Sequence, residues 1–493
     1  MSLTGRPFAG AGPKSAAAQG VPAAGSVRGV RSQAVSIVER TLVSRAPVDS
    51  ELAALAGSFD ERDQALLREI VFGTLRWLKR LDQVLVAASG RTFEQIQPAL
   101  LPVLRVAAYQ LLFLDRVPAH AIVSEAVDEA LRRSHKGAAG FVNAVLRRLA
   151  ARPSLAAWPI ETSAALTSAP TQSSASASSP PSAFAPATAV DPVTRLAIET
   201  SHPEVLVRRW LTQYGEPVTR ALLEANNRQK PMHLLAFRDK GGRERLAEAL
   251  RAEGVESEPS GLSAQGLIVR SGNALRTAAF ARGEFYIQDE VAQLAANLPT
   301  PRPGERVLDV AAAPGGKGLA ILAAEPAVRL VAADLALPRL AALAANHLRL
   351  HTNAALVAAD AQHTPFASAF DRVIVDYPCT GTGTLRKHPE LKWRWSASEL
   401  ERLAAQAVRL LAGAAGAVAP GGLLVAISCS LEPEENEAAG EQFLALVPGF
   451  RRTSAAGRVP AAAASARSRE GVFRWLPSGD HDGFTLQLFE RLS

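Results

Sequence analysis

Hydrophobic residues in the first third of the chain recur every three or four positions, which is the spacing of one face of an α-helix. The pattern extends from Gln33 to Leu149, and Pro118 and Gly140 interrupt it where later helices begin and end. Residues 31–150 are therefore predicted to form an all-helical bundle whose length is usual for one domain.

A shorter mixed segment covers residues 192–283. Two helical stretches come first. Two runs with strand character follow, His233–Arg238 and Gly266–Arg270, with the helix Glu244–Glu253 between them. This order of elements predicts a small α+β unit.

Short apolar runs alternate with helical stretches throughout residues 284–493. The five runs with the strongest strand character are Arg306–Val310, Arg329–Leu335, Ala354–Asp360, Arg372–Tyr377 and Leu423–Ser428. Such alternation is typical of a parallel sheet with helices on both faces. The predicted fold class of this part is α/β, with a doubly wound parallel sheet.

Two further segments have the composition of unfolded chain. Residues 1–30 contain no acidic residue and are rich in Ala, Gly, Ser and Arg, so we expect a disordered tail; a transit peptide has a partly similar composition. Residues 151–191 are dominated by Ser, Ala, Pro and Thr, which bury too little apolar surface to fold, so we expect a flexible linker.

The charge of the chain is biased toward its N-terminal part. The formal net charge is +7 and the pI is about 9.7. Residues 1–150 hold 19 Lys and Arg against 13 Asp and Glu, which accounts for +6 of the excess. This balance fits a polyanionic partner such as nucleic acid, and it fits a solvated helical surface equally well.

Only two cysteines occur, Cys379 and Cys429. Their scarcity argues against a secreted disulfide framework and indicates a reducing, cytoplasmic location. Neither a Cys-x-x-Cys pattern nor a His pair accompanies them, so we expect no metal site. The longest apolar stretch, Leu410 to Ile427, is interrupted by glycines and by Pro420, so we expect no membrane span.

A glycine turn follows the first predicted strand of the α/β part. The segment Arg306-Val-Leu-Asp-Val-Ala-Ala-Ala-Pro-Gly-Gly-Lys317 leads from a strand through this turn into a helix. Glycines let a backbone approach a ligand closely, and a helix N-terminus favours negative charge. A tight turn without a ligand fits the segment nearly as well.

Three aspartates strengthen the ligand interpretation. Asp334, Asp360 and Asp376 come at the ends of the next three predicted strands. Ligands of open α/β sheets bind outside the carboxyl ends of the strands, where these acids would converge. Any one of them could instead cap a helix. The pattern leaves open whether the ligand is a dinucleotide or S-adenosylmethionine.

Both cysteines come just past strand ends on this same sheet edge. Cys379 lies in Asp376-Tyr-Pro-Cys-Thr-Gly-Thr-Gly383, and Cys429 lies in Ser428-Cys-Ser-Leu-Glu-Pro-Glu-Glu-Asn436. A buried cysteine is usually inert packing. Here the position of both thiols at the ligand edge favours a role in chemistry.

Together with the glycine turn, these two segments resemble the motifs of the RNA 5-methylcytosine methyltransferase family. The resemblance implies a Rossmann-like domain that binds S-adenosylmethionine. It also implies that Cys429 is the nucleophile attacking carbon 6 of cytosine, that Cys379 assists release, and that Lys317 and Asp376 lie near the reacting centre. The residues implied for the cofactor are Ala311, Ala312, Ala313, Pro314, Gly315, Gly316, Lys317, Asp334, Asp360 and Asp376.

The N-terminal part narrows this resemblance. Ala107–His120 and Gly140–Arg148 are similar to the NusB-like helical RNA-binding domain, which precedes the catalytic part in a ribosomal small-subunit member of the family. The resemblance implies a monomeric enzyme that acts on an unpaired loop of 16S ribosomal RNA. We expect the bundle to bind RNA separately from the catalytic part, through phosphate contacts of Arg76, Lys79, Arg80, Arg132, Arg133, Lys136, Arg147 and Arg148.

The chain departs from the family pattern at several positions. Tyr377 stands where the family usually has Ala, and Ala426-Ile427 stands where it has Tyr and a small hydroxyl residue. Gly318 replaces a usual Thr. Both thiols and the three aspartates are retained.

Other interpretations remain open at this stage. A nicotinamide-dependent oxidoreductase would share the glycine turn, but its Gly-x-Gly-x-x-Gly spacing is absent. An RNA-binding or ribosome-assembly factor with a relict methyltransferase fold, or a methyltransferase of another RNA such as tRNA, would share most features. Lys387-His388 and Lys392–Trp395 combine cations with aromatic rings, so they indicate either an RNA path or the start of an amphipathic helix.

Overall fold

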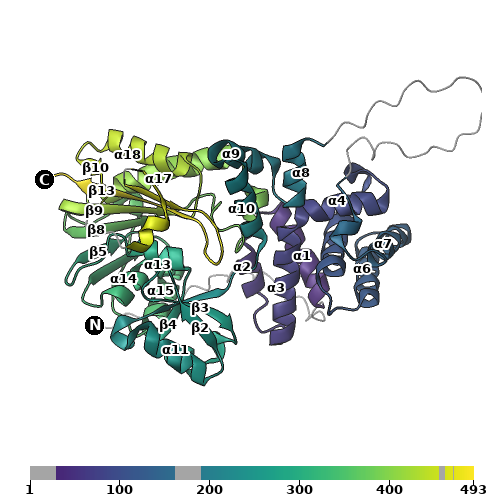
Figure 1. Ribbon diagram of the computed structural model, residues 1–493, viewed down its shortest axis with the longest axis horizontal. Coiled ribbons are helices and arrows are strands. Elements are labelled where there is room, and N and C mark those ends of the chain that lie inside the picture. Colours follow the sequence, from purple (N-terminus) through teal and green to yellow (C-terminus); the bar gives the residue numbers. More distant parts are fainter. Residues whose placement is uncertain (1–28, 161–189, 455–460, 470) are drawn as a thin grey trace, which may run out of the picture.

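The computed structural model describes residues 29–160, 190–454, 461–469 and 471–493 (Figure 1). The predicted tail, up to residue 28, and residues 161–189 of the predicted linker lie outside the described residues. A helical bundle occupies one end of the molecule and a large sheet the other, with three helices between them and a small sheet beside the large one (Figure 1).

The N-terminal part is the predicted all-helical bundle. Its helices are α1 (Val30–Val43), α2 (Val48–Ala53), α3 (Glu61–Arg76), α4 (Leu78–Ser89), α5 (Leu101–Phe113), α6 (Ala119–Arg133) and α7 (Lys136–Ala150). Helix α5 is central and contacts α1, α3, α4, α6 and α7. Local signals agree with these boundaries, because Asp60 caps α3 by accepting from the N–H of Asp63 and Gly90 ends α4 in the left-handed conformation.

Three helices connect the bundle to the rest of the chain: α8 (Pro192–Glu199), α9 (Glu204–Tyr214) and α10 (Glu216–Asn227). Their shared core is built around the fully buried Trp210 and extends to Leu385 and Leu431, which belong to loops of the large sheet. These helices therefore pack directly against the segments that follow the two cysteines.

The small sheet has four antiparallel strands in the order β2-β3-β1-β4. They are β1 (Met232–Ala236), β2 (Glu256–Pro259), β3 (Gly266–Ser271) and β4 (Phe285–Ile287), with the helices α11 (Gly242–Ala252) and α12 (Ala278–Ala281). The two strands and the helix α11 were predicted from the sequence. The short strands β2 and β4 were not, because four and three residues are too few to show an alternating pattern.

The large sheet has a parallel half and an antiparallel half. Its parallel strands are β5 (Arg306–Asp309), β6 (Arg329–Asp334), β7 (Ala355–Ala358), β8 (Phe370–Asp376) and β9 (Val418–Ser428), in the spatial order β9-β8-β5-β6-β7. The predicted doubly wound α/β sheet is confirmed for these five strands. The antiparallel strands are β10 (Phe450–Arg452), β11 (Arg467–Arg469), β12 (Val472–Trp475) and β13 (Phe484–Arg491).

This antiparallel half was not foreseen. Only eight residues separate β12 from β13, which is too short for the crossover that a parallel pair requires. Strand β13 pairs with β9 along six residues, up to Ser428, the residue that precedes Cys429.

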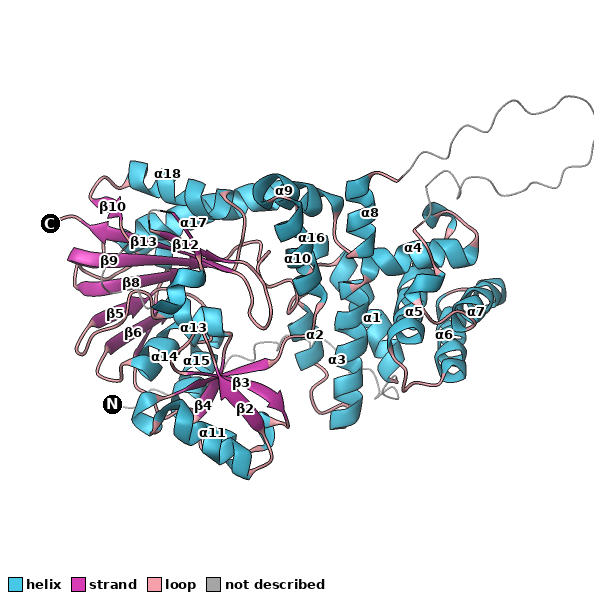
Figure 2. Ribbon diagram, in the orientation of Figure 1, coloured by secondary structure: helices cyan, strands magenta, loops and turns pink. Residues whose placement is uncertain are grey.

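Helices cover both faces of the large sheet (Figure 2). One face packs against α13 (Glu290–Ala296) and α14 (Gly316–Ala324), and α15 (Leu337–Arg349) lies near them. The other face packs against α17 (Ala397–Ala415) and α18 (Ala439–Leu446). Within the described ranges, no helix is both long and apolar enough to cross a membrane.

A buried junction joins the bundle to the large sheet through α16 (Leu391–Arg394). Lys392 is 1% exposed, and its Nζ donates to the carbonyl oxygens of Arg76 and Ser201 and to Oδ1 of Asn227. Trp393 Nε1 donates to the carbonyl oxygen of Leu75 at 2.7 Å. The segment Lys392–Arg394 therefore joins two domains, and its proposed place on the RNA path is wrong.

The basic residues predicted to bind phosphate are largely engaged within the protein. Arg80 donates to carbonyl oxygens at residues 155 and 158, and Arg132 and Arg133 both pair with Glu129. Lys79 pairs with Glu204 of α9. Together with the buried junction, these contacts show a bundle docked on the rest of the molecule, which contradicts the expectation that it acts separately.

We expect the substitution Lys392→Met to loosen this junction. Three oxygen acceptors from three parts of the chain would lose their donor, which should cost about 2 kcal/mol of unfolding free energy. Denaturant unfolding of the full-length variant measures the change. Lys387→Met, at an exposed lysine five residues away, is the matched control and should change stability by less than about 0.5 kcal/mol. Equal stability of both variants would contradict the role of Lys392.

Candidate functional site

A cleft of about 680 Å³ opens at the carboxyl ends of the parallel strands. It brings together most of the residues predicted from the sequence: Ala311, Ala312, Ala313, Pro314, Gly316, Lys317, Asp376, Cys379 and Cys429. Gly315 belongs to the same turn, whereas Asp334 and Asp360 are outside the lining of the cleft.

The glycine turn joins β5 to α14. Gly315 has a φ of +115°, and a side chain there would meet Leu343 at 2.7 Å, so the position requires glycine. The carbonyl oxygen of Gly316 accepts a hydrogen bond of 2.9 Å from Nε2 of Gln288. The turn therefore presents backbone atoms and the N-terminus of α14 to the cleft. A helix N-terminus favours a negatively charged ligand group.

Asp334 and Asp360 flank the turn at strand ends. Asp334 is buried at the end of β6, where its carboxylate accepts from the N–H groups of Ala313 and Ala336. Asp360 follows β7, and its Oδ1 accepts from the N–H of Gln362 at 2.9 Å, so it caps the short helix Ala361–His363. Asp334 therefore supports the glycine turn. Asp360 caps a helix, which was the alternative to a ligand contact considered for these aspartates.

Lys317 and Asp376 form an ion pair in the cleft. Nζ of Lys317 lies 2.7 Å from Oδ2 of Asp376 and 5.4 Å from the centre of the Phe484 ring. Although burial acts to lower the pKa of Lys317, the neighbouring Asp376 carboxylate raises it above its usual value. Lys317 is therefore a cation at neutral pH.

The two thiols are in direct contact. Sγ of Cys379 lies 3.3 Å from Sγ of Cys429, and both cysteines are free and partly exposed. The hydrogen bond from Cys379 lowers the pKa of Cys429, and the charge of Lys317 adds to this effect. The same hydrogen bond, together with burial, raises the pKa of Cys379 well above its usual value. The two shifts have opposite signs, so the pair is polarised and Cys429 is the more acidic thiol.

Close backbone packing holds the thiols together. The N–H of Gly383 donates to the carbonyl oxygen of Cys429 at 2.8 Å, and the N–H of Gly483 donates to the carbonyl oxygen of Gly383 at 2.7 Å. A side chain at Gly383 would meet the oxygen of Gly483 at 2.3 Å. Glycine at this position thus lets three loops approach within hydrogen-bonding distance.

Two buried acids beside the site were not assigned from the sequence. Asp309 ends β5, and burial and the nearby Asp376 raise its pKa to about 7. Lys317 and the backbone N–H groups of Ala311 and Gly318 act in the opposite direction and lower this pKa. Glu435 is 1% exposed, and burial raises its pKa to about 7 as well. Asp309 could have been identified as a candidate site residue from the sequence, because it is an acidic residue at the end of an apolar strand.

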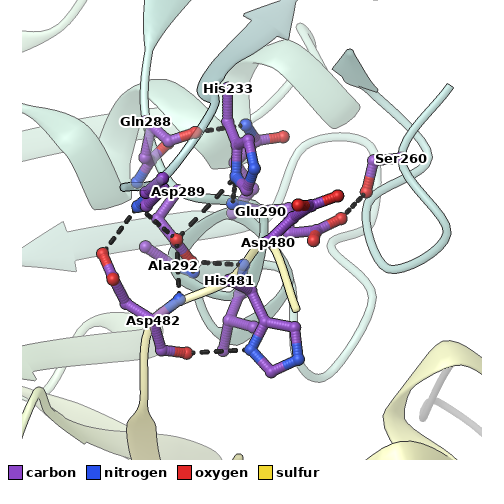
Figure 3. A network of polar contacts seen from close by, with 12 residues as sticks. His233, Ser260, Gln288, Asp289, Glu290, Ala292, Asp480, His481 and Asp482 are labelled. Carbon is purple, nitrogen blue, oxygen red and sulfur yellow. Dashed lines mark hydrogen bonds and ion pairs between the residues drawn. The ribbon is translucent and has the colours of Figure 1, made fainter. Parts of the chain in front are cut away.

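A second polar cluster (Figure 3) contributes residues to the lining of the cleft, among them His233, Asp289 and Asp482. Nζ of Lys230 donates to Asp289 at 2.5 Å and to Asp482 at 2.6 Å, and the N–H of Asp482 donates to Asp289 at 3.0 Å. His233 Nδ1 accepts from the N–H of Glu290, and burial lowers the pKa of His233 to about 4, so the ring is neutral. These contacts fix the loop before β13 and the start of α13.

The helical bundle also reaches the cleft. Arg76, the last residue of α3, lines it and donates to the carbonyl oxygen of Arg386 at 2.9 Å. Lys387 and His388 line the cleft next to this contact. One wall of the cleft is thus shared between the bundle and the loop that follows Cys379.

The sequence is similar to that of ribosomal RNA small subunit methyltransferase B from Pseudomonas putida. The two are 32% identical over 459 residues, which cover 92% of this chain and 96% of the relative. The chain belongs to the RsmB/F family of 16S rRNA methyltransferases. A Bacillus subtilis protein named as a probable ribosomal RNA small subunit methyltransferase B is 31% identical, covering 80% of this chain and 83% of that protein.

Family models divide the chain as the fold does. The model for the 16S rRNA methyltransferase RsmB/F matches residues 296–489, and the NusB family model matches residues 28–151. The model for the ferredoxin-like domain of RsmF/B-like methyltransferases matches residues 202–276. The resemblance to a methyltransferase with an N-terminal NusB-like domain is confirmed.

Solved structures share the fold of this chain in whole or in part. The crystal structure of PH0851 covers 94% of this chain and 99% of its own, with a TM-score of 0.69 and 23% identity. The structure of NSun6 from Pyrococcus horikoshii with SFG covers 59% of this chain and 98% of its own, with a TM-score of 0.51 and 18% identity. These similarities support the fold, and family membership favours a methyltransferase over an oxidoreductase.

Proposed function

We propose that this enzyme transfers a methyl group from S-adenosylmethionine to carbon 5 of one cytosine in 16S rRNA, through a temporary bond between Cys429 and carbon 6. The observation that carries the proposal is the polarised thiol pair. Cys429, the thiol with the lowered pKa, lines an open cleft together with a glycine turn, Lys317 and Asp376. Inert structural cysteines do not need these surroundings.

The residues around the glycine turn fit this cofactor. S-adenosylmethionine supplies an electrophilic methyl group on a positively charged sulfur, together with an amino acid end and an adenosine. The residues Ala311–Pro314 and Gly316 line the cleft next to the N-terminus of α14, which suits the carboxylate of the amino acid end. Asp334 and Asp360 lie outside the lining of the cleft, at the ends of β6 and β7, and in this proposal their remaining acceptor capacity serves the ribose hydroxyls and the adenine amino group.

Cys429 starts the chemistry in this proposal. Its thiolate adds to carbon 6 of the cytosine, and the electrons of the ring double bond make carbon 5 nucleophilic. Asp376 accepts a hydrogen bond from the cytosine amino group, and Lys317 holds the Asp376 side chain in place through their 2.7 Å ion pair. Release requires loss of the carbon 5 proton and of the sulfur, which Cys379 assists.

The cytosine must leave any stack before the thiolate can reach carbon 6. Lys387 and His388, which line the cleft and are not buried, would hold the neighbouring phosphates. Of the two, Lys387 is exposed and continues the loop of Cys379.

Incubation of the full-length enzyme with methyl-labelled S-adenosylmethionine and unmodified 16S rRNA tests this function. We expect label at one cytosine, recovered as 5-methylcytidine after digestion to nucleosides. Transfer RNA serves as the competing substrate. Label in another nucleoside, label only in transfer RNA, or no label with either RNA would contradict the proposal.

A further inference from the structure

Glu435 connects the loops of the two cysteines from behind the cleft. It lies on the π-helical turn η8 (Glu434–Ala438), seven residues after β9. The N–H of Thr380 donates to its Oε1 at 2.7 Å, and the hydroxyl of Thr380 donates to its Oε2 at 2.6 Å. Because Thr380 follows Cys379 directly, this carboxylate fixes the backbone that carries the second thiol.

The turn that carries Glu435 is itself anchored by a buried network. Asn436 accepts hydrogen bonds at Oδ1 from the hydroxyls of Ser428 (2.7 Å) and Tyr377 (3.2 Å). The hydroxyl of Tyr377 also contacts the carbonyl oxygen of Glu435 at 3.0 Å. The tyrosine that replaces the family's usual alanine thus adds a contact between the end of β8 and this turn. Such π-helical turns are frequent at functional sites.

We propose that Glu435 is a positioning residue for release: it holds Cys379 against Cys429 so that the thiol can stabilise the departing sulfur. Glu435 is outside the lining of the cleft, and it acts through Thr380. The contact it maintains is the 3.3 Å distance between the two sulfurs. The inference rests on the covalent mechanism proposed above.

Release breaks the bond between carbon 6 and Sγ of Cys429 and removes the proton from carbon 5. The proton on carbon 5 leaves to water in the open cleft, and the electrons of that C–H bond re-form the double bond between carbons 5 and 6. The bond between carbon 6 and sulfur breaks, and its electron pair returns to Sγ of Cys429. The Cys379 thiol donates a hydrogen bond to the emerging thiolate, which restores the arrangement in the structure.

Single-turnover reactions with labelled S-adenosylmethionine and 16S rRNA, resolved on denaturing gels, separate formation of the protein–RNA adduct from its decay. In Glu435→Gln we expect adduct to form at the wild-type rate and decay about tenfold more slowly, since one charge-assisted hydrogen bond is lost. Thr380→Val should slow decay similarly, whereas Thr380→Ser, which retains both donors, should decay at the wild-type rate. Glu434→Gln, on the same turn and paired with Arg209, is the matched control with unchanged decay.

Two outcomes would overturn the assignment. Wild-type decay in Glu435→Gln, while Cys379→Ala accumulates adduct, would leave the covalent mechanism intact and exclude Glu435. Equal slowing of formation and decay, with a lower Tm, would show a merely structural role. Absence of adduct in Cys379→Ala would instead contradict the covalent mechanism itself.

Discussion

Cys429→Ala should abolish methyl transfer to 16S rRNA while leaving the protein folded. Without the thiolate, carbon 5 of cytosine is too weak a nucleophile, because no group adds to carbon 6. We expect transfer to fall by about 10⁴-fold or more, as when a covalent nucleophile is removed from other enzymes. The measurement is incorporation of labelled methyl groups at saturating RNA and cofactor.

A second substitution at position 429 distinguishes a chemical role of the thiol from a role in packing. Cys429→Ser keeps the size of the side chain, but a hydroxyl does not ionise near neutral pH, so we expect the same loss as in Cys429→Ala. Both variants should retain the wild-type Tm and RNA affinity, because Cys429 is partly exposed and its side chain fills little of the core. Appreciable transfer by either variant would remove the basis of the covalent mechanism.

Much of the fold followed from the hydrophobic pattern. The helices of the bundle were predicted from their periodic apolar positions, and the five parallel strands from apolar runs that alternate with helical stretches. The antiparallel strands β10 to β13 were not predicted, because they pair through contacts far apart in the sequence; β13 itself has eight residues. Pairing of β13 with β9 is set by tertiary packing, which local spacing does not encode.

The candidate site was predictable as a set of motifs, but its internal geometry was not. Both cysteines and the glycine turn could be placed at one sheet edge because parallel strands end together. Their 3.3 Å contact depends on the glycines at positions 383 and 483, which act through backbone approach. For Lys392 the sequence pattern was misleading. A cation between aromatic residues suggested a contact with RNA, but the side chain is buried between two domains.

Cys379→Ala should trap the enzyme on its product. Cys429 remains able to add to carbon 6, so the adduct and the methylated ring still form. The departing sulfur, however, loses the thiol that lies 3.3 Å away and donates to it. We expect release to become rate-limiting, with most of the enzyme recovered as a labelled protein–RNA complex that survives denaturation.

The double variant Cys379→Ala/Cys429→Ala identifies which sulfur carries the RNA. Since the adduct requires the Cys429 thiolate, the double variant should form none, and digestion of the single variant's complex should leave the nucleotide on the peptide that contains Cys429. The thiol pair predicts that Cys429 carries the RNA, because the pKa of Cys429 is lowered and that of Cys379 is raised. An adduct from Cys429→Ala, with none from Cys379→Ala, would reverse the two roles and require Cys379 to become the thiolate when RNA binds.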